Sequence, residues 1–298
     1  MTARTEQLVW VDGRVVPAHA ATISALDRGF RSGEGVFETL RVQQGRAFRL
    51  AAHLERLRAG AAGIGLHVAP PALLEAVAAV VEANAHLGAD LVVRITCSAG
   101  PVQLSDPFPG HRPGPATVVV TAQRTRAAGA PPLPPAFGHL VELHRPLAAW
   151  KATSYLVSLT ATREARRHGA SDALLCDAAG HPLEAATANL FAVRGNTLVT
   201  APVSAEVLPG ITRAAVVELA AALGLVVDQR VMSRSELATA AEALLTSAVR
   251  GVQPLVAVQG RPIGDGMPGP ITRGLAAGLQ ELVATTSLPL SGNGPHER

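Results

Sequence analysis

The sequence predicts an α/β (α+β) protein of two domains, each built from helices and hairpin-rich mixed sheets. Three observations support this fold class. The chain has 298 residues, which is enough for two separate cores. Hydrophobic residues make up 48% and charged residues 16%, a composition typical of globular proteins. Short apolar runs bounded by turn residues alternate with stretches of helical periodicity along the chain.

The N-terminal and smaller domain is expected over residues 1–126. It begins with a hairpin over 8–18, which turns at Asp12-Gly13, and a second hairpin over 36–50, which turns at Gly45. The elements expected next are two helices and two strands, over residues 50–66, 71–88, 90–100 and 115–123. Proline excludes helix and central strand, so the proline-rich stretch that follows, 127–138, is the predicted linker.

The larger C-terminal domain is expected over residues 139–285. It begins with a helix that carries Lys151 and reaches about Gly169. The elements expected next are a strand, a hairpin, a helix, two strands and a last helix, over residues 172–177, 189–202, 211–224, 243–248, 251–259 and from 268. Residues 286–298 are predicted to be a disordered tail.

Composition and charge argue against a nucleic-acid or membrane partner. Net charge is +3, but the arginines are scattered singly among acidic residues, and aromatics are only 3%, too few for base stacking. No stretch is apolar for the ~20 residues that a membrane span needs. The N-terminus lacks the apolar core of a signal peptide. We therefore expect a cytoplasmic protein, with Cys97 and Cys176 as buried thiols.

Of the 26 lysine and arginine residues in the chain, 25 are arginine and one is lysine, Lys151. It lies in an apolar run, 146–162, that also contains the one tyrosine, Tyr155. Arginine replaces lysine where only charge is needed, but a guanidinium keeps its proton and cannot attack a carbonyl. Burial lowers the pKa of a lysine and frees that amine. We therefore favour Schiff-base chemistry at Lys151 over a leftover surface lysine, and in a helix Tyr155 would share its face.

A Schiff-base lysine suggests pyridoxal phosphate, which needs a phosphate site and a partner for its ring nitrogen. In the stretch LPGITR, Gly210 permits close backbone approach, and the amides of Ile211 and Thr212 open a helix. The same stretch also fits an ordinary helix cap. Glu184 lies in a run otherwise free of charge and is a candidate for the ring nitrogen, with a plain loop carboxylate as the equal alternative.

Taken together, these features resemble the class IV aminotransferase family, the fold-type-IV pyridoxal-phosphate enzymes. The resemblance covers roughly residues 8–285. It rests on six stretches in the family's order and spacing: DRGFRSGEGVFETLRV, HLERL, WKATSYL, DALLCDAAGHPLEAATANLF, LPGITR and LLTSAVRGVQPL. It implies a cofactor-binding C-terminal domain, an active site in the cleft between the domains, and at least a homodimer.

The resemblance also implies a role for individual residues. Lys151 matches the lysine that carries the cofactor, and Glu184 matches the carboxylate at the ring nitrogen. The positions matched to phosphate-binding residues are Arg56, Ile211, Thr212, Thr246 and Ser247. Tyr155 is near the tyrosine that bonds the ring oxygen, but its spacing from the lysine is one residue shorter than in branched-chain enzymes. The substrate positions are Phe37, Thr39 and Arg41, with Arg41 and Arg94 as carboxylate anchors. No metal is expected.

The family removes the proton next to a bound amine, after which the reaction is either transamination or elimination. D-amino-acid members resemble one another in a TRG stretch, where this chain has CSAG with Ala99 in the arginine's place. LPGITR, AAHLERLRAGAAGIGL and RITCSAGPVQLSDP are more similar to bacterial 4-amino-4-deoxychorismate lyases. We therefore expect that lyase, which makes 4-aminobenzoate and pyruvate for folate. The alternatives are an aminotransferase for D-amino or branched-chain amino acids and, less favoured, a non-catalytic binding protein.

Overall fold

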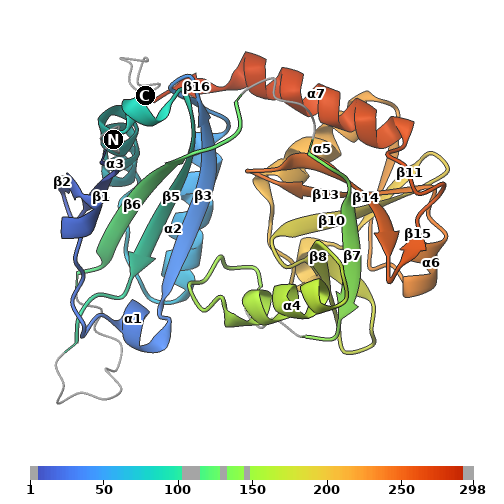
Figure 1. Ribbon diagram of the computed structural model, residues 1–298, viewed down its shortest axis with the longest axis horizontal. Coiled ribbons are helices and arrows are strands. Elements are labelled where there is room, and N and C mark those ends of the chain that lie inside the picture. The colour runs from blue at the N-terminus through green and yellow to red at the C-terminus, as the bar shows by residue number, and fades with distance from the viewer. Residues whose placement is uncertain (1–5, 103–114, 128–132, 144–147, 291–298) are drawn as a thin grey trace, which may run out of the picture. The chain divides into compact units, whose positions relative to one another are not determined.

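The computed structural model describes residues 6–102, 115–127, 133–143 and 148–290 (Figure 1). The chain divides into two compact units. Unit 1 consists of Met1–Ala130, Trp150–Ser154 and Thr286–Arg298, and unit 2 consists of Pro131–Ala149 and Tyr155–Thr285. Each unit combines strands with helices, which confirms the predicted fold class.

Unit 1 contains a seven-stranded sheet in the order β16–β4–β3–β5–β6–β1–β2. Its strands are β1 (Leu8–Val11), β2 (Arg14–Pro17), β3 (Gly35–Gln43), β4 (Arg46–Ala47), β5 (Asp90–Ser98), β6 (Thr117–Arg124) and β16 (Leu288–Pro289). Both predicted hairpins are confirmed as β1–β2 and β3–β4. Every pairing in this sheet is antiparallel, so the prediction of a mixed sheet is wrong for unit 1.

Helices cover one face of this sheet (Figure 1). The helical segments of unit 1 are η1 (Ala18–Ala20), α1 (Arg28–Ser32), α2 (Leu50–Gly63), α3 (Pro70–Ala83) and η2 (Ala85–Leu87). Val36 and Leu40 of β3 pack with Leu54 and Leu57 of α2 in a buried apolar core. Because side chains alternate along a strand, the odd-numbered residues of β3 lie on the opposite face.

Unit 2 contains a nine-stranded sheet that closes on itself. Its strands are β7 (Ala136–Val141), β8 (Asp172–Cys176), β9 (Pro182–Ala185), β10 (Ala188–Arg194), β11 (Thr197–Thr200), β12 (Val226–Gln229), β13 (Glu242–Ser247), β14 (Gly251–Val258) and β15 (Arg261–Pro262). The path β10–β13–β14–β7–β8–β9 returns to β10, because β9 also pairs with β10. β7 is parallel to β8 and β14, whereas β10 is antiparallel to β13, so this sheet is mixed as predicted.

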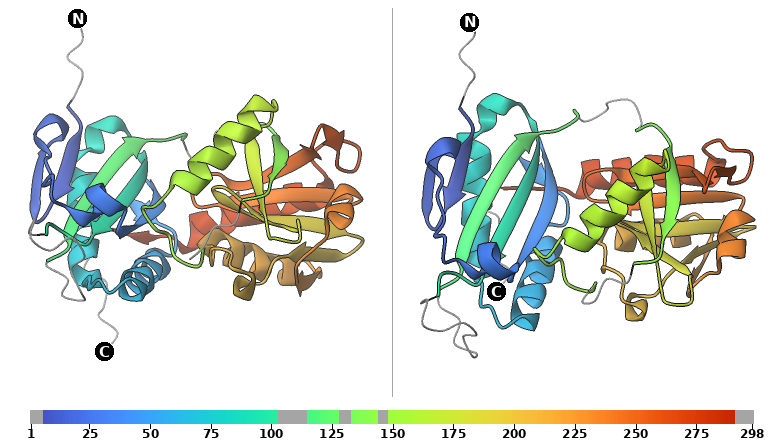
Figure 2. Two further views of the ribbon diagram at one scale, coloured as in Figure 1. Left: turned by 90° about the horizontal axis from the view of Figure 1, so that it is seen from below. Right: turned by 60° about the horizontal axis from the view of Figure 1, so that its bottom comes forward.

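The helices of unit 2 lie outside the closed sheet. They are α4 (Leu156–Arg167), η3 (Val203–Ala205), α5 (Ile211–Ala222), α6 (Arg234–Ala238) and α7 (Pro270–Thr286). Val216 and Ala220 of α5 pack with Phe191 and Leu244 of the sheet. The yellow-green α4 runs beside the green β7 (Figure 2) and packs on β7 and β8. Among the described residues, no helix is long and apolar enough to cross a membrane.

Two predicted segment boundaries need correction. β7 begins at Ala136, so the end of the predicted linker 127–138 is a strand; its prolines precede the strand and leave the pairing intact. Residues 128–132 of that linker lie outside the described residues. The predicted disordered tail, 286–298, includes β16, which pairs with β4, while 291–298 lie outside the described residues. The pairing with β4 supplies backbone hydrogen bonds that composition does not reveal.

Candidate active site

Lys151 lies on a short extended segment of unit 1. Phe37 N donates a hydrogen bond to the Lys151 carbonyl at 2.8 Å, and Thr153 N donates to the Gly35 carbonyl at 2.8 Å. The segment therefore pairs with the start of β3, and α4 begins only at Leu156. The predicted helix from Lys151 is wrong in its first turn, because these backbone groups bond to β3 instead.

The approach of this segment to β3 requires a residue without a side chain at position 35. A Cβ on Gly35 would lie 2.7 Å from the Cys97 carbonyl oxygen and 3.0 Å from Thr153 Oγ1. Any side chain there would push the Lys151 segment away from the strand. Gly35 therefore helps to fix where Lys151 lies.

Tyr155 is the N-cap residue of α4, with φ −91° and ψ 5°. Because Lys151 is not helical, the argument that places the two side chains on one helical face is wrong. The role of Tyr155 at the cofactor rests on the family resemblance alone and stays a prediction.

The Lys151 amine lies against an aromatic ring together with a second cation. Its Nζ is 4.6 Å from the centre of the Phe37 ring, and the Arg94 guanidinium carbon is 3.6 Å from the same centre. Phe37 is only 2% exposed. Both distances are within the ~6 Å at which a cation is attracted to a ring face. The structure thus brings together three of the predicted residues, from β3, β5 and the Lys151 segment.

The two other substrate candidates from β3 lie on the same face as Phe37. Thr39 is directly opposite Arg94 in the β3–β5 register, so their side chains are neighbours. Arg41 donates from Nη2 to the Arg126 carbonyl, and its Nε atom has no hydrogen-bond partner among the described residues. Burial lowers the pKa of Arg41. This face of unit 1 therefore combines one amine, two guanidinium groups and one aromatic ring.

Arg56, the predicted phosphate ligand, is held by a carboxylate that sequence reasoning missed. Its Nε and Nη2 donate to the two oxygens of Glu38, both at 2.8 Å. Glu38 is fully buried, and His53 Nδ1 lies 3.3 Å from its Oε1. Burial by itself raises the pKa of Glu38, but the neighbouring His53 and Arg56 outweigh it and lower the pKa to about 2. Glu38 therefore stays charged and fixes the plane of the Arg56 guanidinium.

In unit 2, three polar residues form a row across neighbouring strands. Glu184 of β9 pairs with Asn189 of β10, and Asn189 pairs with Thr246 of β13. Residues opposite one another in a sheet point to the same face, so the three side chains are neighbours. All three are at least 95% buried. The row lies on the face where α5 packs, since Leu244, two residues before Thr246, contacts that helix.

Glu184 is tied to the chain that leads into α5. Its Oε2 accepts hydrogen bonds from Asn189 Nδ2 at 3.3 Å and from Leu208 N at 3.2 Å. Asn189 Nδ2 also donates to the Leu208 carbonyl at 2.9 Å. Asn189 was not predicted, although its place in the same hairpin as Glu184 was a signal. The carboxylate is therefore oriented by a fixed network and not by a mobile loop.

The N-terminus of α5 lies next to this network. Gly210 is the N-cap residue and has no side chain with which to satisfy the first-turn amides. A Cβ at this position would lie 2.0 Å from Asn189 Oδ1. The predicted phosphate residues Ile211 and Thr212 open the helix, and Thr212 is buried. Backbone amides at a helix N-terminus attract anions.

The end of β13 provides two hydroxyl groups, of which that of Thr246 lies on the same face. The Thr246 Oγ1 atom is buried and has no hydrogen-bond partner among the described residues. Ser247 Oγ accepts a hydrogen bond from Arg250 N at 3.2 Å. A buried hydroxyl without a partner costs about 1–3 kcal/mol, so it indicates a place for a polar ligand atom.

Pyridoxal phosphate fits these residues. The cofactor needs a carboxylate for its ring nitrogen, and Glu184 is a buried, oriented carboxylate. It needs donors for its phosphate, and the α5 N-terminus and the Thr246 hydroxyl supply unsatisfied polar groups. It needs an amine, and Lys151 is the one lysine of the chain.

Comparisons with known proteins agree with this chemistry. The family model described as amino-transferase class IV matches residues 35–258. The chain is 31% identical to the branched-chain-amino-acid aminotransferase of Salmonella typhimurium over 289 residues. The aligned region covers 92% of this chain and 92% of that protein. It is 26% identical over 282 residues to the D-alanine aminotransferase of Bacillus licheniformis, which covers 92% of this chain and 96% of the relative.

Solved structures show the same fold. The crystal structure of branched-chain aminotransferase from Thermoproteus uzoniensis with norvaline superposes with a TM-score of 0.86 at 29% identity, over 96% of this chain and 100% of that chain. The family resemblance predicted from sequence is thereby confirmed. The chain belongs to the class IV aminotransferase family and is a pyridoxal-phosphate-dependent enzyme.

Proposed function

We propose that this enzyme is an aminotransferase for amino acids with apolar side chains, with branched-chain L-amino acids as the preferred donors. The relatives described above support this reading, because they are named as aminotransferases for branched-chain amino acids and for D-alanine. The lyase expected first from the sequence is not among these activities, so the aminotransferase alternative is favoured. The Thermoproteus uzoniensis structure includes norvaline, which is an unbranched apolar amino acid.

The observation that carries the proposal is the Phe37 ring with Lys151 and Arg94 against it. An amino acid needs an amine-reactive group and a cationic anchor for its carboxylate, and this face offers both. The neighbours of the anchor carry no charge: Thr39 and Thr121 lie directly opposite Arg94, Val92 is two residues from it, and Val119 is diagonal to it in the β5–β6 register. An apolar substrate side chain fits such a surface better than a charged one. Thr39 and Arg41 complete the proposed substrate face.

Pyridoxal phosphate, when bound, supplies an aldehyde that takes up the substrate amine and a ring that withdraws electrons from it. Lys151 would hold this aldehyde in the resting enzyme, and its amine would move the proton at the substrate α carbon. Glu184 would hold the proton of the ring nitrogen, because Asn189 and Leu208 fix the position of its carboxylate.

The proposed phosphate ligands follow from the family resemblance. They are Arg56, Ile211, Thr212, Thr246 and Ser247. Arg56 contributes a guanidinium whose plane Glu38 fixes, and the α5 residues contribute backbone amides. Tyr155 is kept as the ring-oxygen partner on the family resemblance. We also propose a homodimer, for which light scattering should give twice the 30.6 kDa chain mass.

The test compares two reactions of the purified holoenzyme. With L-leucine, L-valine or D-alanine alone, an aminotransferase converts one equivalent of cofactor to the amine form and stops. Addition of 2-oxoglutarate restores turnover, and L-leucine or L-valine should be faster than D-alanine. Lys151→Arg keeps the positive charge and should abolish turnover, because arginine neither binds the aldehyde nor releases a proton.

Two results would contradict the proposal. Sustained release of pyruvate from 4-amino-4-deoxychorismate without any oxo acid, together with no amino-acid half-reaction, would assign the chain as the lyase. A preference for D-alanine would reject the branched-chain assignment and keep the aminotransferase. Borohydride reduction followed by peptide mapping should place the pyridoxyl group on Lys151 in every case.

A further inference from the structure

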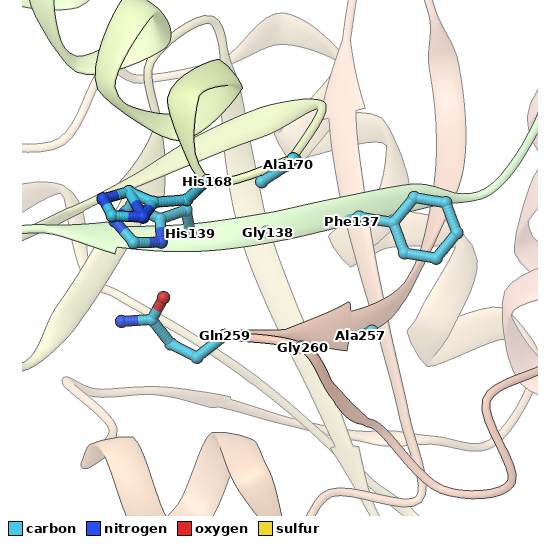
Figure 3. A pocket seen from close by; sticks show the side chains of 9 residues that line it. Phe137, Gly138, His139, His168, Ala170, Ala257, Gln259 and Gly260 are labelled. Carbon is cyan, nitrogen blue, oxygen red and sulfur yellow. The ribbon is translucent and has the colours of Figure 1, made fainter.

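A pocket of unit 2 is separate from all of the residues assigned above. It has a volume of about 310 Å³ and lies between β7, the C-terminal end of α4 and the end of β14. Figure 3 shows the rings of His139 and His168 at one end of the group of lining side chains and Phe137 at the other. The Gln259 side chain extends near the two histidines.

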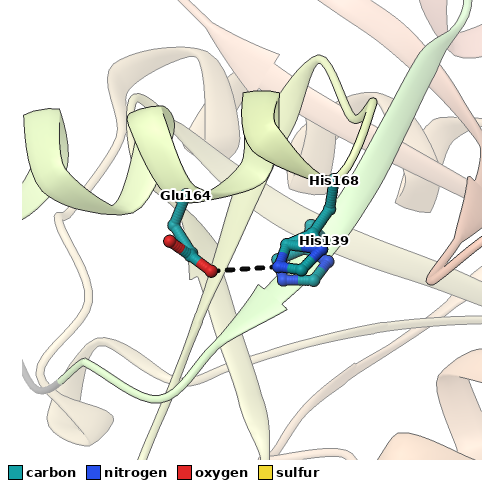
Figure 4. A group of neighbouring side chains, drawn as sticks. All are labelled: His139, Glu164 and His168. Carbon is teal, nitrogen blue, oxygen red and sulfur yellow. Dashed lines mark hydrogen bonds and ion pairs between the residues drawn. The ribbon is translucent and has the colours of Figure 1, made fainter.

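The two histidines meet a carboxylate at this end of the pocket (Figure 4). His139 comes from β7, whereas Glu164 and His168 come from the last turn and C-cap of α4. The imidazole rings are stacked, with centroids 4.1 Å apart and planes at 16°. His168 Nε2 is 3.0 Å from Glu164 Oε1. One possible ligand atom from each of the three residues lies within 4.8 Å of the others.

Two imidazoles and one carboxylate are a known donor set for zinc with an open coordination position. Around a tetrahedral zinc ion with bonds of about 2.0–2.2 Å, the ligand atoms are roughly 3.3 Å apart. The ligand atoms therefore need to approach one another by up to about 1.5 Å, and the two stacked rings must turn so that a nitrogen of each faces the ion. His168 is exposed and Glu164 is partly exposed, so both have room to rotate.

A purely structural explanation accounts for only part of this cluster. Glu164 and His168 are four residues apart on a helix, and such pairs stabilise many helices. That explanation does not require His139, which comes from a different element. The Gln259 side chain extends near the two histidines, where its amide can orient a ring nitrogen (Figure 3). A neutral imidazole, oriented through its other nitrogen, is the form that binds a metal.

We propose that His139, Glu164 and His168 form a binding site for a zinc-class divalent cation, with an open coordination position toward the neighbouring pocket. Imidazole donors favour zinc, copper and nickel over magnesium and calcium. The ion links β7 to the end of α4 and leaves room for water or a small anion in the pocket. The sequence prediction named no metal, because Glu164 and His168 give only a two-residue signal and His139 is remote from them in sequence.

Equilibrium dialysis of the untagged holoenzyme against Zn²⁺ tests the proposal. We expect one tightly bound equivalent of zinc per chain, and no such equivalent with Mg²⁺. His139→Ala and His168→Ala should each lose this equivalent, and Glu164→Gln should bind it more weakly. Gln259→Ala should lower the affinity by about 10- to 100-fold, as expected for a residue that orients a ligand.

His181→Ala is the matched control. His181 Nδ1 is 3.0 Å from Asp177 Oδ2, so this pair has the same four-residue spacing, but among the described residues no third metal-binding group lies beside it. The control should retain the zinc equivalent, and zinc should raise the melting temperature of the native chain and the control but not of His139→Ala. Absence of the equivalent from the native chain, or its persistence in both His139→Ala and His168→Ala, would overturn the proposal. Cofactor absorbance without zinc should be equal in all variants, which excludes misfolding as the cause of a loss.

Discussion

The ion pair between Glu38 and Arg56 should make unit 1 sensitive to acid. We consider the substitution Glu38→Gln, which keeps the shape of the side chain and removes its charge. Glu38 is fully buried, and both of its oxygens accept hydrogen bonds from Arg56. The substitution leaves the partly buried guanidinium of Arg56 with a weaker partner, and removing one member of such a pair destabilises the fold.

The expected magnitude follows from the pKa of Glu38. Its value falls from 4.5 to about 2 in the folded chain. At about 1.4 kcal/mol for each pKa unit, the charged carboxylate stabilises the folded state by roughly 3 kcal/mol. A lowered pKa gives stability that is present above pH 4.5 and is lost as the pH falls toward 2. Glu38→Gln should therefore lose about 3 kcal/mol at pH 7 and show a smaller acid dependence below pH 4.5.

Tryptophan fluorescence during urea unfolding measures the stability of unit 1, where Glu38 lies. The chain has two tryptophans, and both Trp10 and Trp150 belong to unit 1. Unfolding curves of the two chains should be collected at pH 7, 5 and 3. The free-energy difference between native chain and Glu38→Gln should shrink between pH 5 and pH 3.

Glu55→Gln is the matched control. Glu55 also forms two hydrogen bonds with an arginine, Arg58, but this pair is exposed on α2. Solvent screens such a pair, so the control should unfold with the native chain. A native-like stability of Glu38→Gln at pH 7, or an equal effect of both substitutions, would refute the reasoning.

Three further predictions concern other residues. Gly210→Ala should weaken pyridoxal phosphate binding in a titration, because the new Cβ would lie 2.0 Å from the side-chain oxygen Oδ1 of Asn189. Gly274→Ala in α7 is the comparison: its new Cβ meets no atom within 4 Å, and it should stabilise the chain by about 0.5–1 kcal/mol. Thr246→Val should make the apo-protein slightly more stable in thermal unfolding and lower cofactor affinity by about tenfold, because it removes a buried hydroxyl without a partner; equal affinity would place the phosphate elsewhere. Burial raises the pKa of both Cys97, to about 12, and Cys176, so a thiol reagent at pH 8 should label neither until the chain is unfolded.

Local patterns were sufficient for most of the fold. The hairpin at Asp12-Gly13 was predictable because both turn residues adopt positive φ, which Asp-Gly favours. The helix that opens at Ile211 was predictable from the glycine before it. β16 was not predictable, because two residues form a strand only through their partner β4. The helix predicted to start at Lys151 was wrong for the same reason, since the backbone of this segment bonds to β3 and not to its own next turn.

The candidate site shows the same division between local and distant information. Lys151 was found because it is the one lysine, a property of composition that needs no structure. Glu38 was missed because a glutamate in a strand is ordinary until its burial and its bond to Arg56 are known. Asn189 was missed because its importance comes from strand register, which joins Glu184 to Thr246.

The path of the chain between the two units has a consequence for protein synthesis. Unit 1 begins with the first residues and is completed only by Trp150–Ser154 and by β16 near the end. Once the first 130 residues have left the ribosome, the sheet of unit 1 therefore has a β4 edge that still lacks its partner. An unpaired edge is a template for association with other chains. Chains that end before Leu288 should consequently form more aggregate than chains that carry a surface substitution.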